Sequence, residues 1–204
     1  MTVGIILIVG AVCLTVYNIY DSGRADKAAD MVMDELKSMI TAKPEVTTQA
    51  PSGGEVGEHE GETPDYVTYP EMPMPTVTVE ERRYIGYIEI PALGLTLPVA
   101  GEDWDYAILA KTPCLYSGSV YTDNAIIAGH NYTSHFGRLT RLPKGAVVNF
   151  VDAAGNVFFY EVAWTETIVE TDIEGMESGD DWDMSLFTCN YAGDKRFTVR
   201  LVRR

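Results

Sequence analysis

The chain opens on a long apolar run that extends from Val3 to Tyr20 and is interrupted by Asn18. This length is close to the roughly 20 residues that a helix needs to cross a bilayer. A cleaved signal peptide would have a shorter apolar core and a small-residue cleavage site, and no clear site follows here. The pattern therefore predicts that residues 1–20 form an uncleaved transmembrane anchor rather than a buried helix of a globular domain.

A different pattern follows the apolar run. Apolar residues recur at spacings of four and three in Ala25, Ala29, Val32, Leu36 and Met39, without an intervening proline. One face of an α-helix repeats in this way. We therefore predict a juxtamembrane helix over residues 21–43, acting as a short stalk or packing helix.

Residues 44–80 have a different composition from their neighbours. Six of the ten prolines lie here, with many Glu, Thr and Gly residues and no Lys or Arg. Such a segment buries too little apolar surface to offset the entropy lost on ordering it. The composition predicts an extended acidic linker, and no functional role is expected for His59 inside it.

The remaining residues, 81–204, alternate short β-rich runs with turn residues. Two such runs flank residues 152–156, which carry turn residues and indicate a hairpin. Residues 103–111 favour one short helix. Seven or eight short strands in about 120 residues predict an all-β domain, either a barrel or a sandwich. The predicted strands are residues 84–90, 95–99, 124–128, 147–151, 157–162, 184–189 and 197–202.

The charge of the chain excludes some classes of partner. The formal net charge is −15, whereas nucleic-acid binding needs clustered Lys and Arg side chains to contact phosphates. The same charge argues against a domain that adheres to anionic lipid. Hydrophobic residues make up 46% of the chain, which is enough to build a packed core.

The three cysteines, Cys13, Cys114 and Cys189, form neither a disulfide framework nor a metal-binding spacing. A single functional thiol is the more natural interpretation. Cys13 lies inside the apolar run, Cys114 in a predicted loop, and Cys189 near the end of a predicted strand. A reactive cysteine needs a base or a cation nearby to favour the thiolate, so Cys114 and Cys189 are both candidates on chemistry alone.

Two histidines and one arginine are candidate partners for such a thiol. His130 follows a predicted strand and Gly129, and His135 lies five residues further on. Arg196 opens the last predicted strand, seven residues after Cys189. Adjacent antiparallel strands joined by a six-residue loop would bring Cys189 and Arg196 together, where a guanidinium could donate hydrogen bonds to an oxyanion. Arg200, Arg203 and Arg204 are expected to be ordinary cations at a strand edge.

Four short motifs stand in a fixed order along the β-rich part of the chain. They are IGYIEIPALG at residues 85–94, AGHN at 128–131, LFTC at 186–189 and KRFTV at 195–199. Together they resemble the opening strand, the histidine segment, the Leu-x-Thr-Cys signature and the arginine segment of the sortase family. The order His, Cys, Arg also matches, and the resemblance covers roughly residues 82–204.

The resemblance implies a closed eight-stranded sortase-type β-barrel with one or two short helices, preceded by a transmembrane helix and a stalk. It implies that Cys189 is the nucleophile of a cysteine transpeptidase, that His130 transfers protons, and that Arg196 holds the substrate carbonyl or its oxyanion. Thr188 and Asn131, which adjoin the nucleophile and the histidine, are expected to contact the substrate. No cofactor and no metal ion are expected.

The resemblance also implies the partners. The substrate would be a secreted protein with a C-terminal sorting signal of the Leu-Pro-x-Thr-Gly type, and the acceptor a cell-wall precursor or a pilin amine. This chemistry belongs outside the cell, so we expect a single-pass membrane protein with an extracellular catalytic domain. Arg24 and Lys27 follow the apolar run, and no Lys or Arg precedes it. Because positive charges tend to stay on the cytoplasmic side, this distribution mildly disfavours an extracellular catalytic domain.

Two other functions remain as alternatives at this point. A hydrolytic cysteine protease would use the same kinds of side chain, but papain-like enzymes place the cysteine before the histidine. A non-enzymatic surface β-domain, such as an adhesin or scaffold on a stalk, would not need the combination of Cys189, His130 and Arg196.

Overall fold

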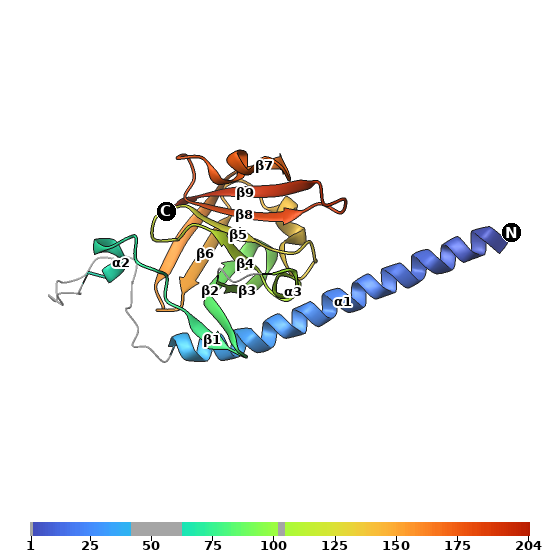
Figure 1. Cartoon of the computed structure of the whole chain (residues 1–204), viewed down its shortest axis with the longest axis horizontal. Helices are drawn as coiled ribbons and strands as arrows, with labels where there is room; N and C mark the ends of the chain where they lie inside the picture. Colours follow the sequence, from blue (N-terminus) through green and yellow to red (C-terminus); the bar gives the residue numbers. More distant parts are fainter. Residues whose placement is uncertain (1, 42–62, 102–104) are drawn as a thin grey trace.

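The computed structural model describes residues 2–41, 63–101 and 105–204, and within them eight strands close into a barrel (Figure 1). The barrel order is β2-β3-β4-β5-β8-β9-β7-β6, and it closes because β6 also pairs with β2. This confirms the predicted eight-stranded barrel. The strands are β2 (Arg82–Ile90), β3 (Leu95–Ala100), β4 (Cys114–Ser117), β5 (Ala125–Ala128), β6 (Val147–Asp152), β7 (Val157–Val169), β8 (Met184–Cys189) and β9 (Lys195–Arg203).

Several short helical turns precede or connect the strands, more than the one or two that the sequence predicts. The predicted helix within residues 103–111 is α3 (Tyr106–Leu109), which begins after Asp105 because that side chain accepts a hydrogen bond from the Ile108 amide at 2.7 Å. The other turns are α2 (Asp65–Thr68), η1 (Pro91–Leu93), η2 (Phe136–Arg141) and α4 (Ile173–Glu177).

Strands β5 and β8 lie in the middle of the sheet and are buried on both faces. All four residues of β5 are buried, although neighbouring side chains of a strand point to opposite faces. Ile127 belongs to the core inside the barrel, whereas Ile126 and Ala128 belong to a second apolar cluster outside it. That outer cluster also contains Phe187 of β8, so the connection between β7 and β8 covers this part of the barrel wall.

Arg200 fixes this connection to the barrel. The sequence suggested an ordinary cation at a strand edge, but Arg200 is 1% exposed. Its guanidinium lies 2.7 Å from the Glu166 carboxylate and donates to the Met176 and Gly175 carbonyl groups at the end of α4. The prediction was wrong because β9 is covered here by the preceding connection, which brings acceptors over an otherwise apolar wall. The guanidinium also lies 4.6 Å from the centre of the Trp182 ring.

Helix α1 (Thr2–Thr41) is continuous, and its second half packs against the barrel. Val32, Leu36 and Ile40 share an apolar cluster with Tyr84 and Cys114. Cys114 is therefore the first residue of a covered strand, not part of a loop as the sequence suggested. The spacing of the apolar residues predicted Ala29, Val32 and Leu36 on this face correctly, whereas Met39 is 40% exposed and Ile40 is buried in its place.

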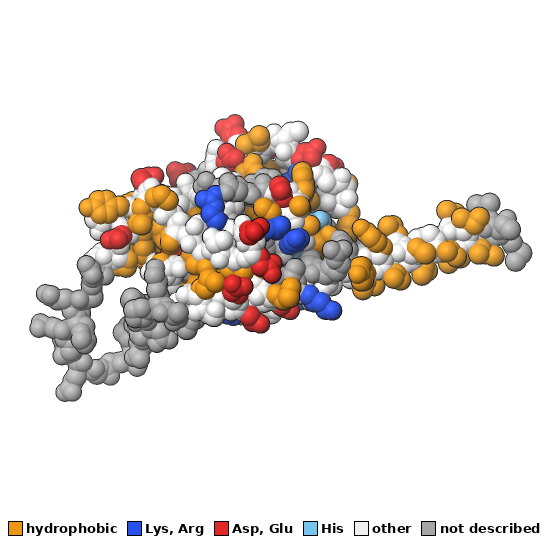
Figure 2. Space-filling model, turned by 60° about the horizontal axis from the view of Figure 1, so that its bottom comes forward, with side chains coloured by type: hydrophobic (Ala, Val, Ile, Leu, Met, Phe, Trp, Pro, Cys, Tyr) orange, Lys and Arg blue, Asp and Glu red, His pale blue; other side chains and the backbone are white. Residues whose placement is uncertain are grey.

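The first half of α1 extends beyond the barrel, and Figure 2 shows hydrophobic side chains along it. Ile6 and Leu7 are 69% and 68% exposed. In the part of the chain that the structure describes, no helix combines the length and apolar character needed to cross a membrane. The predicted transmembrane anchor over residues 1–20 is therefore not supported by the structure.

Part of the predicted linker packs against the barrel. The linker was predicted over residues 44–80, of which 44–62 lie outside the described residues. Tyr66 of α2 stacks on Tyr121, with ring centroids 4.7 Å apart, and Met72 and Met74 pack against the core. Strand β1 (Val77–Val79) then pairs with β2. The folded unit therefore begins before residue 81.

His135 is fully buried in the connection between β5 and η2. Its exposed fraction is 0%, and no described residue makes a hydrogen bond of normal geometry with either ring nitrogen. Burial lowers the pKa of His135 to about 4, and the nearby His130 acts in the same direction, while the Lys111 backbone opposes the shift. His135 is therefore neutral near pH 7, in a position unsuited to proton exchange with solvent.

We expect Leu36→Ala to lower the free energy of unfolding by about 2–5 kcal/mol, because it removes a fully buried side chain between α1 and the barrel. Met31→Ala is the matched control on the same helix; Met31 is 64% exposed, so a change within about 0.5 kcal/mol is expected. Urea unfolding measures both. Alkylation of Cys114, located by peptide mapping, should accelerate in Leu36→Ala, and equal labelling of both variants would contradict this packing.

We also expect His135 to make the stability depend on pH. Its pKa is near 6.5 in an unfolded chain and about 4 in the native one, so between these values the unfolded state alone binds the proton. The stabilisation is present above pH 6.5 and is lost as the pH falls. Between about pH 7.5 and about pH 5 the wild type should lose about 2 kcal/mol more than His135→Leu. Parallel pH dependence of unfolding in the two proteins would contradict the buried neutral histidine.

Candidate active site

Cys189 and Arg196 face each other across two neighbouring strands. Strands β8 and β9 are antiparallel, and Cys189 at the end of β8 is registered directly with Arg196 near the start of β9. Directly opposed residues of an antiparallel pair point to the same face of the sheet. Phe187 lies on that face as well, so the thiol lies on the outer wall of the barrel, beyond the apolar cluster that covers this face.

His130 reaches the same place by a different route. Strand β5 runs parallel to β8, with Ala128 registered against Phe187, and the Gly129 amide donates to the Phe187 carbonyl at 3.0 Å. His130 therefore leaves β5 at the same end at which Cys189 leaves β8. Glycine is required at position 129, where the chain leaves β5, because a Cβ there would lie 2.3 Å from a ring carbon of Phe136.

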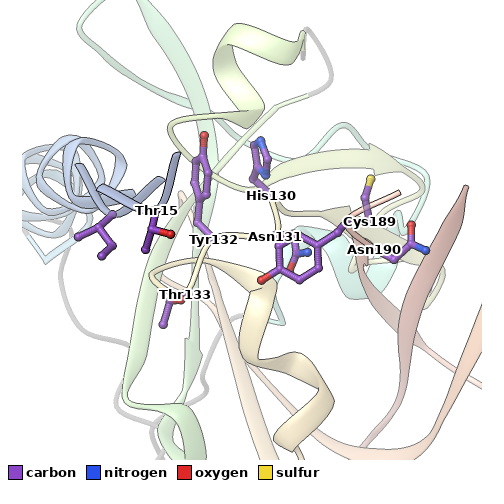
Figure 3. A pocket seen from close by; sticks show the side chains of 9 residues that line it. Thr15, His130, Asn131, Tyr132, Thr133, Cys189 and Asn190 are labelled. Carbon is purple, nitrogen blue, oxygen red and sulfur yellow. The ribbon is translucent and has the colours of Figure 1, made fainter. Parts of the chain in front are cut away.

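Cys189 and His130 line one cavity of about 570 Å³ (Figure 3). The β5–η2 connection and the turn between β8 and β9 form two of its walls. The third wall comes from α1. The lining residues are Thr15, Ile19, His130, Asn131, Tyr132, Thr133, Cys189, Asn190 and Tyr191.

The turn after Cys189 is organised by Asn190. Its side-chain oxygen accepts a hydrogen bond from the Gly193 amide at 2.8 Å, and its side-chain nitrogen donates to Asp194 at 2.7 Å. Gly193 has φ +83°, a left-handed conformation that favours glycine. The position of the thiol at the end of β8 is thus fixed by strand pairing on one side and by this turn on the other.

The guanidinium of Arg196 makes its contacts outside the cavity. Its Nη1 donates to the Gly193 carbonyl at 2.7 Å, and its Nη2 lies 3.8 Å from the Glu170 carboxylate. Arg196 is not among the residues that line the cavity. The structure thus brings its backbone beside Cys189, while its side chain forms contacts with the turn and with the end of β7.

The two expected substrate contacts differ in placement. Asn131 lines the cavity beside His130. Thr188 is 3% exposed and does not line it, and its hydroxyl has no hydrogen-bond partner among the described residues. Side chains alternate along a strand, so Thr188 points to the face opposite Cys189. The placement therefore does not support a contact between Thr188 and the substrate.

The other two cysteines lie apart from this cavity. Cys114 is 0% exposed, and burial raises the pKa of its thiol to about 12, with Asp105 acting in the same direction. A thiol of this kind is a poor nucleophile because the thiolate is the reactive form. Cys13 is exposed on the first half of α1. In the described ranges, no three His, Cys, Asp or Glu side chains gather as a metal ion would require.

No sequence pattern singled out Tyr132, Asn190 or Tyr191 as cavity residues. These residues can be assigned to one cavity only after β5 and β8 are known to end side by side. The turn chemistry of Asn190 and Gly193 was a usable signal, because both residue types favour tight turns. Chemically, a thiol and an imidazole in one cavity can carry out nucleophilic attack and proton transfer.

Comparison with known proteins bears on this arrangement. The model of the sortase domain family matches residues 88–204. A comparison with curated proteins gave no match. Among solved structures, sortase C of Streptococcus pneumoniae is similar with 25% identity and a TM-score of 0.54, over 62% of this chain and 70% of that chain.

Two further solved structures share the fold. Sortase C-3 of S. pneumoniae has 20% identity and a TM-score of 0.55, over 93% of this chain and 84% of that chain. A lid mutant of sortase A from Corynebacterium diphtheriae has 19% identity and a TM-score of 0.55, over 69% of this chain and 88% of that chain. The barrel, the cysteine at the end of β8 and the match of the family model lead to one conclusion: the chain belongs to the sortase family of cysteine transpeptidases.

Proposed function

We propose that Cys189, His130 and Arg196 carry out transpeptidation on a sorting signal of a secreted protein. The observation that carries the proposal is the single cavity lined by Cys189 and His130, with Arg196 registered directly across the β8–β9 pair. Nucleophile, proton carrier and cation thus lie at one end of neighbouring strands. The barrel provides a rigid support for all three.

In the first step the Cys189 thiolate attacks the scissile carbonyl carbon and a tetrahedral oxyanion forms. The carbon–nitrogen bond then breaks, and His130 gives its proton to the departing amine, which leaves a thioester. In the second step the incoming amine attacks the thioester and loses a proton to His130. The carbon–sulfur bond breaks, the thiolate is restored, and a new amide is released.

Arg196 has to turn toward the cavity to take part. Its present partners are a turn carbonyl and the half-exposed Glu170 carboxylate, so exchanging the carboxylate for a substrate oxygen costs little in a solvated position. A guanidinium presents five N–H donors in a planar fork. We infer that one of these donors binds the carbonyl oxygen as negative charge develops on it.

The proposed donor is a Leu-Pro-x-Thr-Gly-like signal, and the proposed acceptor is a cell-wall precursor or a pilin amine. Two similar structures support this choice of substrates. The work on S. pneumoniae sortase C concerns pilin substrate specificity, and a sortase C of Clostridium perfringens was solved with a C-terminal cell wall sorting motif. Asn131, which lines the cavity beside His130, is the proposed polar contact to the bound peptide.

The proposed location is at the cell membrane with the barrel outside the cell. The exposed apolar side chains of Ile6, Leu7 and Ile8 support attachment through the first half of α1. Co-flotation of the full chain with lipid vesicles, compared with a chain that begins at residue 23, measures this attachment. Equal flotation of the two proteins would remove α1 as the attachment element.

We expect Cys189→Ala to abolish transpeptidation and to leave the fold intact, because it removes the nucleophile from a half-exposed strand end. Cys114→Ala is the matched control, since it removes a buried thiol outside the cavity. The measurement is mass spectrometry of products from a library of Leu-Pro-x-Thr-Gly-like peptides, with and without an added amine. Product formed only with water would favour a hydrolase, and activity retained in Cys189→Ala would end the proposed mechanism.

We expect Arg196→Lys to lower kcat/KM by about 10²–10³, because an ammonium cannot reproduce a well-placed guanidinium donor at an oxyanion. Arg204→Lys is the matched control. Arg204 follows β9 directly, its side chain is 53% exposed, and its Nε lies 3.5 Å from the Glu161 carboxylate. Arg200→Lys is unsuitable as a control because Arg200 is buried and holds α4. If Arg196→Lys and Arg204→Lys retain equal activity, Arg196 has no part in catalysis.

A further inference from the structure

Two aromatic rings stand face to face in the wall of the cavity. The imidazole of His130 and the ring of Tyr132 have centroids 4.0 Å apart and planes inclined by 10° (Figure 3). This distance is van der Waals contact between two nearly parallel rings. One face of the imidazole is thus covered by a tyrosine two residues further along the chain.

Tyr132 is itself held in place by its backbone. Its carbonyl accepts hydrogen bonds from the His135 amide at 3.0 Å and from the Gly137 amide at 2.9 Å. A Cβ at Gly137 would lie 2.7 Å from the same carbonyl, so glycine permits this close approach. The Phe136 amide also donates to the His130 carbonyl at 3.2 Å. The loop that carries both rings is therefore a hydrogen-bonded frame.

A third ring lies near Tyr132. The His135 ring centroid is 5.7 Å from that of Tyr132, with planes inclined by 54°. His135 is fully buried, so it offers the tyrosine ring a neighbour that is itself held in place. Its burial also keeps it neutral near pH 7, so it adds no positive charge beside a protonated His130.

We propose that Tyr132 is a positioning residue for His130, which orients the imidazole and stabilises its protonated form by stacking. A cation over an aromatic face is attracted by the negative charge of that face, and an imidazolium stacked on tyrosine meets this condition. The stack also limits rotation of the His130 side chain within an open cavity. The inference rests on the proposed role of His130 as the proton carrier.

The stack makes a prediction that separates the tyrosine ring from its hydroxyl group. Tyr132→Phe keeps the ring and should keep kcat within about twofold, whereas Tyr132→Leu removes it and should lower kcat by about 10- to 100-fold. KM for the donor peptide should change by about twofold or less in both variants, because the tyrosine acts through His130. A rise in KM with unchanged kcat would indicate that Tyr132 contacts the substrate, and it would overturn the inference. Equal decreases in kcat for the two variants would also overturn it.

Nuclear magnetic resonance tests the stack without relying on activity. The chain has three histidines, so the His130 ring protons can be assigned in the full chain with single substitutions. Wild type should give nuclear Overhauser contacts between the His130 and Tyr132 rings. The His130 ring-proton resonances should move downfield in Tyr132→Leu, because the stacked ring that shields them is removed. They should keep their positions in Tyr132→Phe. They should also keep them in Tyr191→Leu, the control, which removes a 98% exposed tyrosine at the same cavity.

Two different failures can be told apart. If His130→Ala retains transpeptidation, the proposed function of His130 is wrong, whatever the ring contacts are. If His130→Ala is inactive while Tyr132→Leu keeps wild-type kcat, the function stands and the positioning role of Tyr132 fails. Should Tyr132→Leu not fold, the wild-type ring contacts and the Tyr132→Phe kinetics still decide, because absent contacts or a large loss of kcat in Tyr132→Phe would each overturn the inference.

Discussion

The parallel pairing of β5 with β8 is the constraint on which the site depends. His130 and Cys189 are far apart in the chain, and the ladder from Ala125–Met184 to Ala128–Phe187 makes their strands end together. Parallel neighbours require a long crossover connection, which here runs through η2, β6, β7 and α4. Because that crossover includes the barrel strands β6 and β7, the juxtaposition of His130 and Cys189 depends on a large part of the barrel being in place.

A two-sided core makes this pairing durable. Strands β5 and β8 carry buried residues on both faces, so a one-residue slip would have to repack the inner core and the outer apolar cluster at the same time. The outer face is covered because Arg200, paired with the Glu166 carboxylate of β7, holds α4 against it by donating to two α4 carbonyl groups. Removal of Arg200 would leave buried acceptors without a donor, which costs more than the contact itself contributes. The arginine thus protects the register of the site from outside the cavity.

The sequence predicted the parts of this structure that depend on local pattern. Alternating apolar residues located most strands, and the short loop between Cys189 and Arg196 predicted their pairing. Properties that depend on distant neighbours were not accessible. Arg200 resembled other strand cations until α4 covered it, and Tyr132 acquired a role only when its ring was placed against His130. Thr188 shows a related limit, because a residue beside the nucleophile in sequence lies on the opposite face of the strand.

The three walls of the cavity differ in how firmly they are held. Cys189 and His130 are fixed by backbone ladders, so their separation varies little. The wall from α1 is different, because Ile19 lies ten residues before Ala29, where the buried face of α1 begins. Ten residues correspond to about 15 Å of helix, and a bend of about 10° over that length would displace Ile19 by roughly 3 Å. The α1 wall of the cavity is thus held by contacts that lie farther from the cavity than the strand ends that carry Cys189 and His130.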